Sequence, residues 1–350
     1  MHEAALPARS SDDWRQGRSN AIRRLLSEYA PCDDEDLLFQ MMVTLCRLAA
    51  DGTDRGDLKL LNQALKELRY AFKIFAPYVG TRKVSIFGSA RTAQDHPQYL
   101  QAKKFAGMIQ RNGWMVITGA GDGIMRAGHQ GATRESSFGV AISLPFEQTA
   151  NTFIAGDPKL VNFKYFFTRK LIFVKEADAI ALFPGGFGTQ DEGFESLTLV
   201  QTLKTTPKPI ILCDEPGGTY WQNWRAYVAS ELLGNAMIDA SDMDLFYQTD
   251  RAEDAVEAIL RFYRRYHSSR FVGEQMVFRL NSALSARALS ELNTDFADVL
   301  TSGSFVQVDQ PLEEERGEYA DKPRLVFAFN RRSAGRLRLL IDRINEGGMD

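Results

Sequence analysis

The sequence predicts an α/β protein built around a doubly wound parallel sheet, and three observations lead to this class. From Val84 onwards, short runs are apolar at nearly every position. Helical stretches separate these runs, and glycine-bearing turns follow several of them. Such runs, alternating with helices, are typical of parallel strands covered on both faces. We expect a Rossmann-like domain over residues 80–268, a helical N-terminal extension over 1–79 and a small C-terminal α/β unit over 269–350.

The segment before this domain has a helical pattern. After a polar start that is expected to fray, residues 33–50 and 56–76 carry apolar residues at spacings of three and four, as one face of an α-helix does. The acidic residues 33–36 open the first of these helices, where negative charge suits the positive end of the helix dipole. We expect the apolar faces to pack against the sheet or against a partner subunit.

Within the central domain, apolar runs that end in glycine or proline are expected to be strands. They are VSIFG (84–88), WMVITGAGDG (114–123), FGVAISLP (138–145), AIALFPGGFGT (179–189) and PIILCD (209–214). A helix over 252–266 is expected to end the domain. The remaining chain reads as strand (275–280), helix (285–300), strand (304–310), acidic loop (311–323), strand (324–329) and helix (334–345).

Composition limits the classes of partner. The 350 residues carry a formal net charge of −3, which gives no overall attraction for nucleic acid or for an anionic membrane. No run approaches the length of a membrane span, and the N-terminus lacks an apolar signal region. The cysteines, Cys32, Cys46 and Cys213, are widely separated and lack a CxxC spacing, so we expect neither disulfides nor zinc. A cytoplasmic protein is expected.

The strongest chemical signal is the segment that follows the run AIALF. It reads Pro184, Gly185, Gly186, Phe187, Gly188 and Thr189. The proline stiffens the strand exit, and the glycines let the backbone approach a ligand closely. Thr189 supplies a hydroxyl and can cap the next helix. We interpret this segment as a phosphate cradle.

Two further turns fall where strands of the same sheet end, the edge at which open α/β sheets bind ligands. One contains Gly88 and Ser89, followed by the cation Arg91. The other spans residues 119–123, with Gly119, Gly121 and Gly123, and opens a helix whose first amides can face an anion. Either turn alone also has a simple packing explanation. Their shared position favours a common site.

Motif spacing separates this site from two better-known ones. The glycines do not match GxGxxG, and no acidic residue is placed to bind a ribose, so an NAD-dependent oxidoreductase is disfavoured. No Gly-Lys-Ser/Thr follows the cradle, so triphosphate hydrolysis has little support.

Other charged residues are weighed by their surroundings. Arg169 and Lys170 lie in a helix that leads into the cradle strand; adjacent cations are usually solvated, but a guanidinium beside anion loops can grip phosphate. His96 and His129 lack metal-ligand spacing and are read as structural or exposed. The cluster Arg261, Arg264, Arg265 and Arg270 lies near a helix C-terminus, where it suits the dipole, with an anionic effector site as the alternative.

Taken in order, FGSAR, VITGAGDGIMRAGHQGA, SLPFEQ, KYFFTRK and DAIALFPGGFGTQDE resemble the LOG family over roughly residues 80–260. The family's hallmark PGGxGTxxE is complete from Pro184 to Glu192. Members have often carried the label lysine decarboxylase, but the sequence offers no lysine context for pyridoxal phosphate. Characterised members are phosphoribohydrolases that cleave nucleoside 5′-monophosphates, including cytokinin ribotides, to free base and ribose 5-phosphate, usually as homodimers.

The resemblance implies a catalytic pair, Arg169 and Glu192, with Lys170 beside the ligand. It implies that Ser89, residues 119–123 and residues 185–189 line the nucleotide, with no metal or other cofactor. Glycosidic cleavage passes through an oxocarbenium-like state that a carboxylate can stabilise, and the same carboxylate can accept a proton from water.

Many relatives carry GGGPGIMEA where this chain has GAGDGIMRA, so Asp122 and Arg126 replace a proline and a glutamate. The complete pair Arg169 and Glu192 favours an enzyme acting on AMP-like or cytokinin ribotides. The two replacements favour the alternative, a non-enzymatic nucleotide sensor or carrier of the same superfamily.

Overall fold

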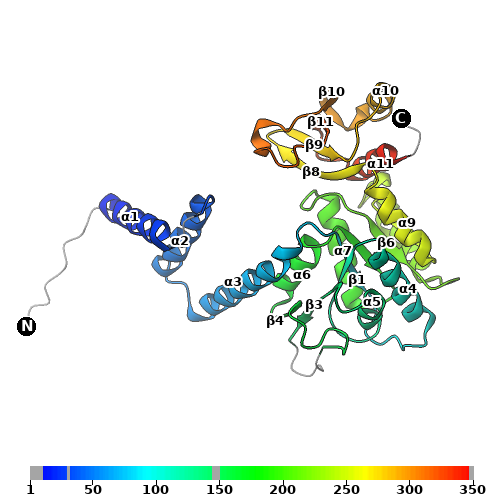
Figure 1. Ribbon diagram of the computed structural model, residues 1–350, viewed down its shortest axis with the longest axis horizontal. Coiled ribbons are helices and arrows are strands. Elements are labelled where there is room, and N and C mark those ends of the chain that lie inside the picture. Colours follow the sequence, from blue (N-terminus) through cyan, green and yellow to red (C-terminus); the bar gives the residue numbers. More distant parts are fainter. Residues whose placement is uncertain (1–10, 30–31, 144–149, 347–350) are drawn as a thin grey trace, which may run out of the picture. The chain divides into compact units, whose positions relative to one another are not determined.

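The computed structural model describes residues 11–29, 32–143 and 150–346 (Figure 1). The chain divides into two compact units at residues 65 and 66. The first unit contains α1 (Ser11–Tyr29), α2 (Glu35–Ala50) and the start of α3 (Arg55–Phe75). The two helices expected over 33–50 and 56–76 are therefore confirmed. The expected fraying is wrong for residues 11–29, which are helical, with Ile22 and Leu26 buried.

A seven-stranded sheet forms the centre of the second unit, in the order β4-β3-β2-β1-β5-β6-β7. Every pairing between neighbouring strands in it is parallel. Its strands are β1 (Lys83–Phe87), β2 (Met115–Thr118), β3 (Ser137–Ile142), β4 (Leu160–Phe163), β5 (Ala179–Leu182), β6 (Ile210–Cys213) and β7 (Phe246–Thr249). Apolar side chains fill both faces of its central strands, because each face is covered by helices.

The helices form two layers, which confirms the doubly wound α/β fold. One buried cluster joins α4 (Pro97–Arg111), α5 (Ile124–Ala132) and α9 (Ala252–Phe262) to the sheet. A second cluster, on the other face, includes Phe75 of α3, α6 (Phe166–Lys175), α7 (Phe187–Gln201) and α8 (Tyr220–Tyr227). Short helices η1 (Ala76–Tyr78), η2 (Val228–Leu233) and η3 (Ala240–Asp244) connect these elements.

The C-terminal part adds a four-stranded antiparallel sheet in the order β10-β11-β9-β8. Its strands are β8 (Tyr266–Val272), β9 (Gln275–Leu280), β10 (Leu300–Val308) and β11 (Arg324–Phe329), and its helices are α10 (Ala286–Asp295), η4 (Ala297–Val299), η5 (Glu313–Glu315) and α11 (Ala334–Asn345). Phe278, Leu292, Phe327 and Leu340 belong to one buried cluster. This sheet agrees with the expected small α/β unit.

The sequence did not reveal three strands. Two of them, β4 and β7, form the edges of the seven-stranded sheet and have four residues each. The third, β8, has the polar sequence YHSSRFV at the edge of the second sheet. Edge strands bury fewer side chains, so their apolar signal is weak. Among the described ranges, no helix is long and apolar enough to cross a membrane.

Candidate functional site

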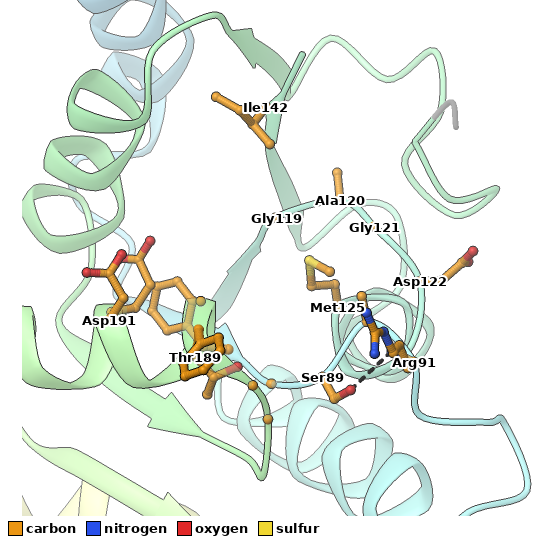
Figure 2. A pocket seen from close by; sticks show the side chains of 18 of the residues that line it. Ser89, Arg91, Gly119, Ala120, Gly121, Asp122, Met125, Ile142, Thr189 and Asp191 are labelled. Carbon is orange, nitrogen blue, oxygen red and sulfur yellow. Dashed lines mark hydrogen bonds between the residues drawn. The ribbon is translucent and has the colours of Figure 1, made fainter. Parts of the chain in front are cut away.

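A cavity of about 1200 Å³ lies at the carboxyl edge of the seven-stranded sheet, where the strand order reverses between β1 and β5. Open α/β sheets bind ligands at this switch point, because the loops there diverge to opposite faces. The loops that follow β1, β2 and β5 line the cavity (Figure 2). The three glycine turns singled out in the sequence therefore share one site.

Backbone hydrogen bonds join these three loops. The amide of Ser89 donates to the carbonyl oxygen of Pro184 at 3.1 Å, and the amide of Ile124 donates to the carbonyl oxygen of Ser89 at 3.0 Å. Gly123 has a φ of +59°, and a Cβ there would lie 2.2 Å from that same carbonyl oxygen. Only glycine satisfies both requirements at position 123. The residue thus fixes the distance between the first two loops.

The cradle that follows β5 ends in the N-terminus of α7. A Cβ at Gly185 would lie 2.2 Å from the Thr189 hydroxyl oxygen, so the turn closes tightly on that side chain. A Cβ at Gly186 or Gly188 would meet nothing within 4 Å, so these positions face open space. The first turn of α7 contains no acidic residue, and its amides carry the positive end of the helix dipole. This end of the cavity is suited to an anion.

Tyr220 supports the cradle from α8. Its hydroxyl donates to the carbonyl oxygen of Gly185 at 2.5 Å and accepts from Nε2 of Gln190 at 2.6 Å. The ring also lines the cavity. No motif in the sequence pointed to Tyr220, although the run EPGGT directly before it marks a loop at the end of β6.

Arg169 lies on α6 and its guanidinium reaches the loop after β2. Its Nε donates to the carbonyl oxygen of Val140 at 2.9 Å, which fixes the direction of the side chain. A Cβ at Gly119 would lie 2.5 Å from Nη2 of Arg169. Gly119 therefore makes room for the guanidinium, and both residues line the cavity.

Glu192 lies in the second turn of α7 and lines the same cavity. Its side chain is largely buried, with 7% of the residue exposed. Within the described part of the chain, Oε2 of this carboxyl group has no hydrogen-bond partner. Burial raises the pKa of Glu192 to about 7, against the opposing effect of the positive charges of Lys170 and Arg169. The group can therefore exchange a proton near neutral pH.

Lys170 points to the acidic side chains that flank Glu192 on α7. Its Nζ lies 2.7 Å from Oδ2 of Asp191 and 2.8 Å from Oε2 of Glu195. Burial lowers the pKa of Lys170, but the hydrogen bonds to these two carboxylates outweigh that effect and raise it. The ammonium group is thus a permanent charge close to Glu192.

The structure brings most of the residues predicted from the sequence to the cavity surface. The lining includes Gly88, Ser89, Gly119, Gly121, Arg169, Gly185, Gly186, Gly188, Thr189 and Glu192. Lys170 and Gly123 are not among the lining residues; the first contacts α7, and the second spaces two loops. Of the expected motif SLPFEQ, residues 144–148 lie outside the described residues.

The lining contains further residues of the predicted turns, and some residues that the sequence did not single out. Arg91 follows Ser89 and donates its amide to the Ser89 hydroxyl at 3.1 Å. Asp122 and Met125 lie near Arg91, whereas Ile142 lies across the cavity from Ser89 (Figure 2). Phe166 and Phe187 add exposed aromatic rings. Met125, Ile142 and Phe166 lie outside the predicted turns, so only the fold places them at the cavity.

The remaining candidates lie outside the cavity lining. His129 is buried and hydrogen-bonded, which agrees with a structural role, and His96 caps α4. Arg261 and Arg264 line a shallow groove beside Glu253 and Glu257. Cys32, Cys46 and Cys213 are all free. Across the described ranges, no three His, Cys, Asp or Glu residues are grouped to hold a metal ion.

Comparisons with solved structures found similar chains that cover about half of this one. The molybdenum cofactor carrier protein from Chlamydomonas reinhardtii is 18% identical, covering 52% of this chain and 97% of its own, with a TM-score of 0.36. The molybdenum cofactor binding protein from Rippkaea orientalis is 19% identical (51% and 96%, TM-score 0.36). DNA processing protein A from Helicobacter pylori is 13% identical (52% and 82%, TM-score 0.34). These similarities do not identify a ligand.

The comparison with curated proteins found no match. A protein-family model described as "Possible lysine decarboxylase" matches residues 119–259. This segment contains the second glycine turn, Arg169 and the complete PGGxGTxxE motif. Residues 119–259 are thus similar to this family, which agrees with the resemblance of the chain to the LOG family.

Proposed function

We propose that this protein is a nucleoside 5′-monophosphate phosphoribohydrolase, which hydrolyses the N-glycosidic bond of AMP-like or cytokinin ribotides. The observation that carries the proposal is Glu192. It offers a buried carboxyl oxygen without a hydrogen-bond partner, in a group whose pKa is raised to about 7 by burial, on the wall of the cavity that also contains the phosphate cradle. A general base with a pKa near the working pH is the group that water activation needs.

In the proposed reaction, the ionised Glu192 accepts a proton from a water molecule as the water oxygen bonds to C1′ of the ribose. The bond from C1′ to the base nitrogen breaks, and its electron pair leaves with the base. The base then takes up a proton, which balances the proton given to Glu192. The negative carboxylate also stabilises the positive charge that develops on the sugar ring. The products are the free base and ribose 5-phosphate.

The phosphate group of the substrate is assigned to the cradle of residues 185–189. Its amides at the start of α7 and the hydroxyl of Thr189 are suited to bind an anion. Arg169 lines the same cavity and is held in place by its bond to Val140. We assign it the role of orienting the nucleotide and of offsetting negative charge during the reaction.

We further propose that the protein acts as a homodimer in the cytoplasm. Exposed apolar side chains at α6 and α7 support a partner surface, because solvated proteins rarely expose such groups together. They are Phe166, Phe167, Leu171 and Phe187, the last of which is 95% exposed. Phe166 and Phe187 also line the cavity, so a second copy bound there would lie close to the nucleotide. Sedimentation velocity of the wild type and of Leu171→Arg tests this: the wild type should sediment as a dimer and the variant as a monomer.

The alternative is a nucleotide sensor or carrier without turnover. Asp122 and Arg126 favour it, because they occupy the positions of a proline and a glutamate in many relatives and pair with each other at 3.6 Å. One experiment separates the two functions. Purified protein is incubated with a panel of nucleoside monophosphates, and released base is measured by chromatography. Release of base supports the hydrolase; binding of AMP without release supports the sensor.

A further inference from the structure

Ala120 has an unusual backbone conformation in the middle of the loop that follows β2. Its φ is +63°, in the left-handed region that residues with a Cβ adopt at an energetic cost. Ala120 is buried, and with its neighbours Gly119 and Gly121 it lines the nucleotide cavity. A strained conformation persists only where surrounding groups hold it.

The groups that hold this loop come from Asn151. Its side-chain amide Nδ2 donates to the carbonyl oxygen of Ala120 at 3.0 Å and to that of Gly121 at 2.9 Å. The backbone amide of Asn151 also donates to the carbonyl oxygen of Ala120, at 2.9 Å. Since carbonyl oxygens only accept, these contacts fix the orientation of the amide group. Oδ1 of Asn151 accepts from the amide of Phe153 at 3.2 Å.

His129 contacts the side chain of Asn151. Nε2 of His129 lies 3.0 Å from the carbonyl oxygen of Phe138, so this nitrogen carries the proton, and it lies 3.0 Å from the hydroxyl oxygen of Thr118. Nδ1 then carries no proton and lies 3.1 Å from Nδ2 of Asn151, whose two hydrogens it shares with the carbonyl oxygens of Ala120 and Gly121. Burial lowers the pKa of His129, which keeps the ring in the neutral form that this pattern needs. The amide of Ala120 closes the network by donating to the Thr118 hydroxyl at 3.0 Å.

We propose that Asn151 and His129 are positioning residues: together they hold Ala120 in its left-handed conformation and so set the wall of the cavity formed by residues 119–121. Neither side chain lines the cavity. Their effect on the nucleotide passes through the loop backbone. The same wall faces the guanidinium of Arg169, because a Cβ at Gly119 would contact it. A displaced loop would therefore disturb both the ligand surface and Arg169.

The proposal is tested first without a ligand. Hydrogen exchange of the full-length protein, followed by mass spectrometry, reports on peptides that cover residues 118–124. Asn151→Ala should increase exchange there by at least about tenfold, since the loop loses two side-chain hydrogen bonds. Asn235→Ala is the matched control, because its amide also donates to a backbone carbonyl, that of Glu231, on an exposed turn. Unchanged exchange in Asn151→Ala would overturn the proposal.

A second-site substitution tests the role of the conformation itself. If Asn151→Ala lowers the population of the binding-competent loop to about a tenth, the affinity for AMP should fall about tenfold. Glycine adopts positive φ without strain. Ala120→Gly, added to Asn151→Ala, should therefore restore much of this affinity. Ala236→Gly is the control: Ala236 has a φ of +55° on the surface, so it relieves similar strain elsewhere and should not restore binding. Equal restoration by both would count against the proposal.

His129 is tested with two amides of different length. His129→Asn keeps an acceptor near the position of Nδ1, facing Asn151, whereas His129→Gln keeps a donor near the position of Nε2, facing Phe138. We expect His129→Gln to weaken AMP binding several-fold more than His129→Asn does. Equal losses of affinity in the two variants would overturn the role of His129. The AMP measurements rest on the proposed function. If the wild type does not bind AMP, that function fails, and the exchange experiment still decides the positioning role.

Discussion

The carboxylate of Asp122 lies 3.6 Å from the guanidinium of Arg126, four residues later in the chain. The two replacements relative to many family members are thus paired with each other. Asp122 also lines the cavity, and its side chain is mostly exposed. The pair therefore places one partly compensated negative charge at the edge of the cavity.

Removal of this charge should favour an anionic ligand. We expect Asp122→Asn to tighten AMP binding about twofold at low salt, the effect of one charge across about 8 Å of water, and the gain should shrink at high salt. Isothermal titration calorimetry at two salt concentrations measures it. Asp95→Asn is the control, because Asp95 is exposed and does not line the cavity. A weaker affinity in Asp122→Asn would contradict this account.

Substitution of Glu192 should separate turnover from binding. Glu192→Gln keeps the size of the side chain and removes the base, so kcat should fall at least about a hundredfold, while the Kd for AMP should change little. Steady-state base release and calorimetry measure the two quantities. Asp191→Asn is the matched control one residue away, where the carboxylate pairs with Lys170. Equal losses in both variants would show that Glu192 has no special role.

The pKa of Glu192 predicts how activity depends on pH. Burial raises this pKa to about 7, and the base form is the ionised carboxylate. The rate of base release, as kcat/KM, should therefore rise with pH and level off above about pH 7. A profile that is already flat from pH 5 upwards would contradict the assignment.

Stability gives an independent check of the same pKa. A carboxyl group whose pKa is higher in the folded state binds more protons folded than unfolded between about pH 4.5 and 7, so the folded state loses stability as pH rises through this range. Glu192→Gln removes this loss. The difference in the free energy of unfolding between the variant and the wild type should therefore change in favour of the variant from pH 4.5 to pH 7, by at most roughly 3 kcal/mol. Urea denaturation at both pH values measures this difference.

Charge in the cavity predicts the class of ligand. Among the described residues, the charged side chains of the lining are Arg91 and Arg169 against Asp122, Asp191 and Glu192, so the cations do not outnumber the carboxyl groups and the extra negative charge of a triphosphate is disfavoured. We expect AMP to bind more tightly than ATP or NAD. Competition titrations with a fluorescent AMP analogue measure the order. Tighter binding of ATP or NAD would exclude the proposed substrate class.

The fold and the position of the site were largely predictable from the sequence, because they depend on local signals. The apolar runs before Gly88, Gly119 and Gly185 are all parallel strands, and the glycines after them meet at one edge of the sheet. A strand whose two faces are both buried needs apolar residues at every position, so it is easily recognised.

Other features depend on contacts between distant segments and left no local signal. Tyr220 reaches the cradle from α8, and the partners of the side-chain nitrogen Nδ2 of Asn151 lie 22 to 31 residues earlier in the chain. The sequence also placed Lys170 beside the ligand, but its ammonium group binds Asp191 and Glu195. The sequence alone could not predict that Lys170 is absent from the cavity lining.

The hydrogen bonds that join Ser89 to Pro184 and to Ile124 have a consequence for kinetics. Because the three loops are already fixed to one another before a ligand arrives, binding needs no slow rearrangement of the cradle. A nucleotide should then associate in a single step, with an observed rate that increases linearly with its concentration. Differences in affinity between related nucleotides should then appear in their dissociation rate constants.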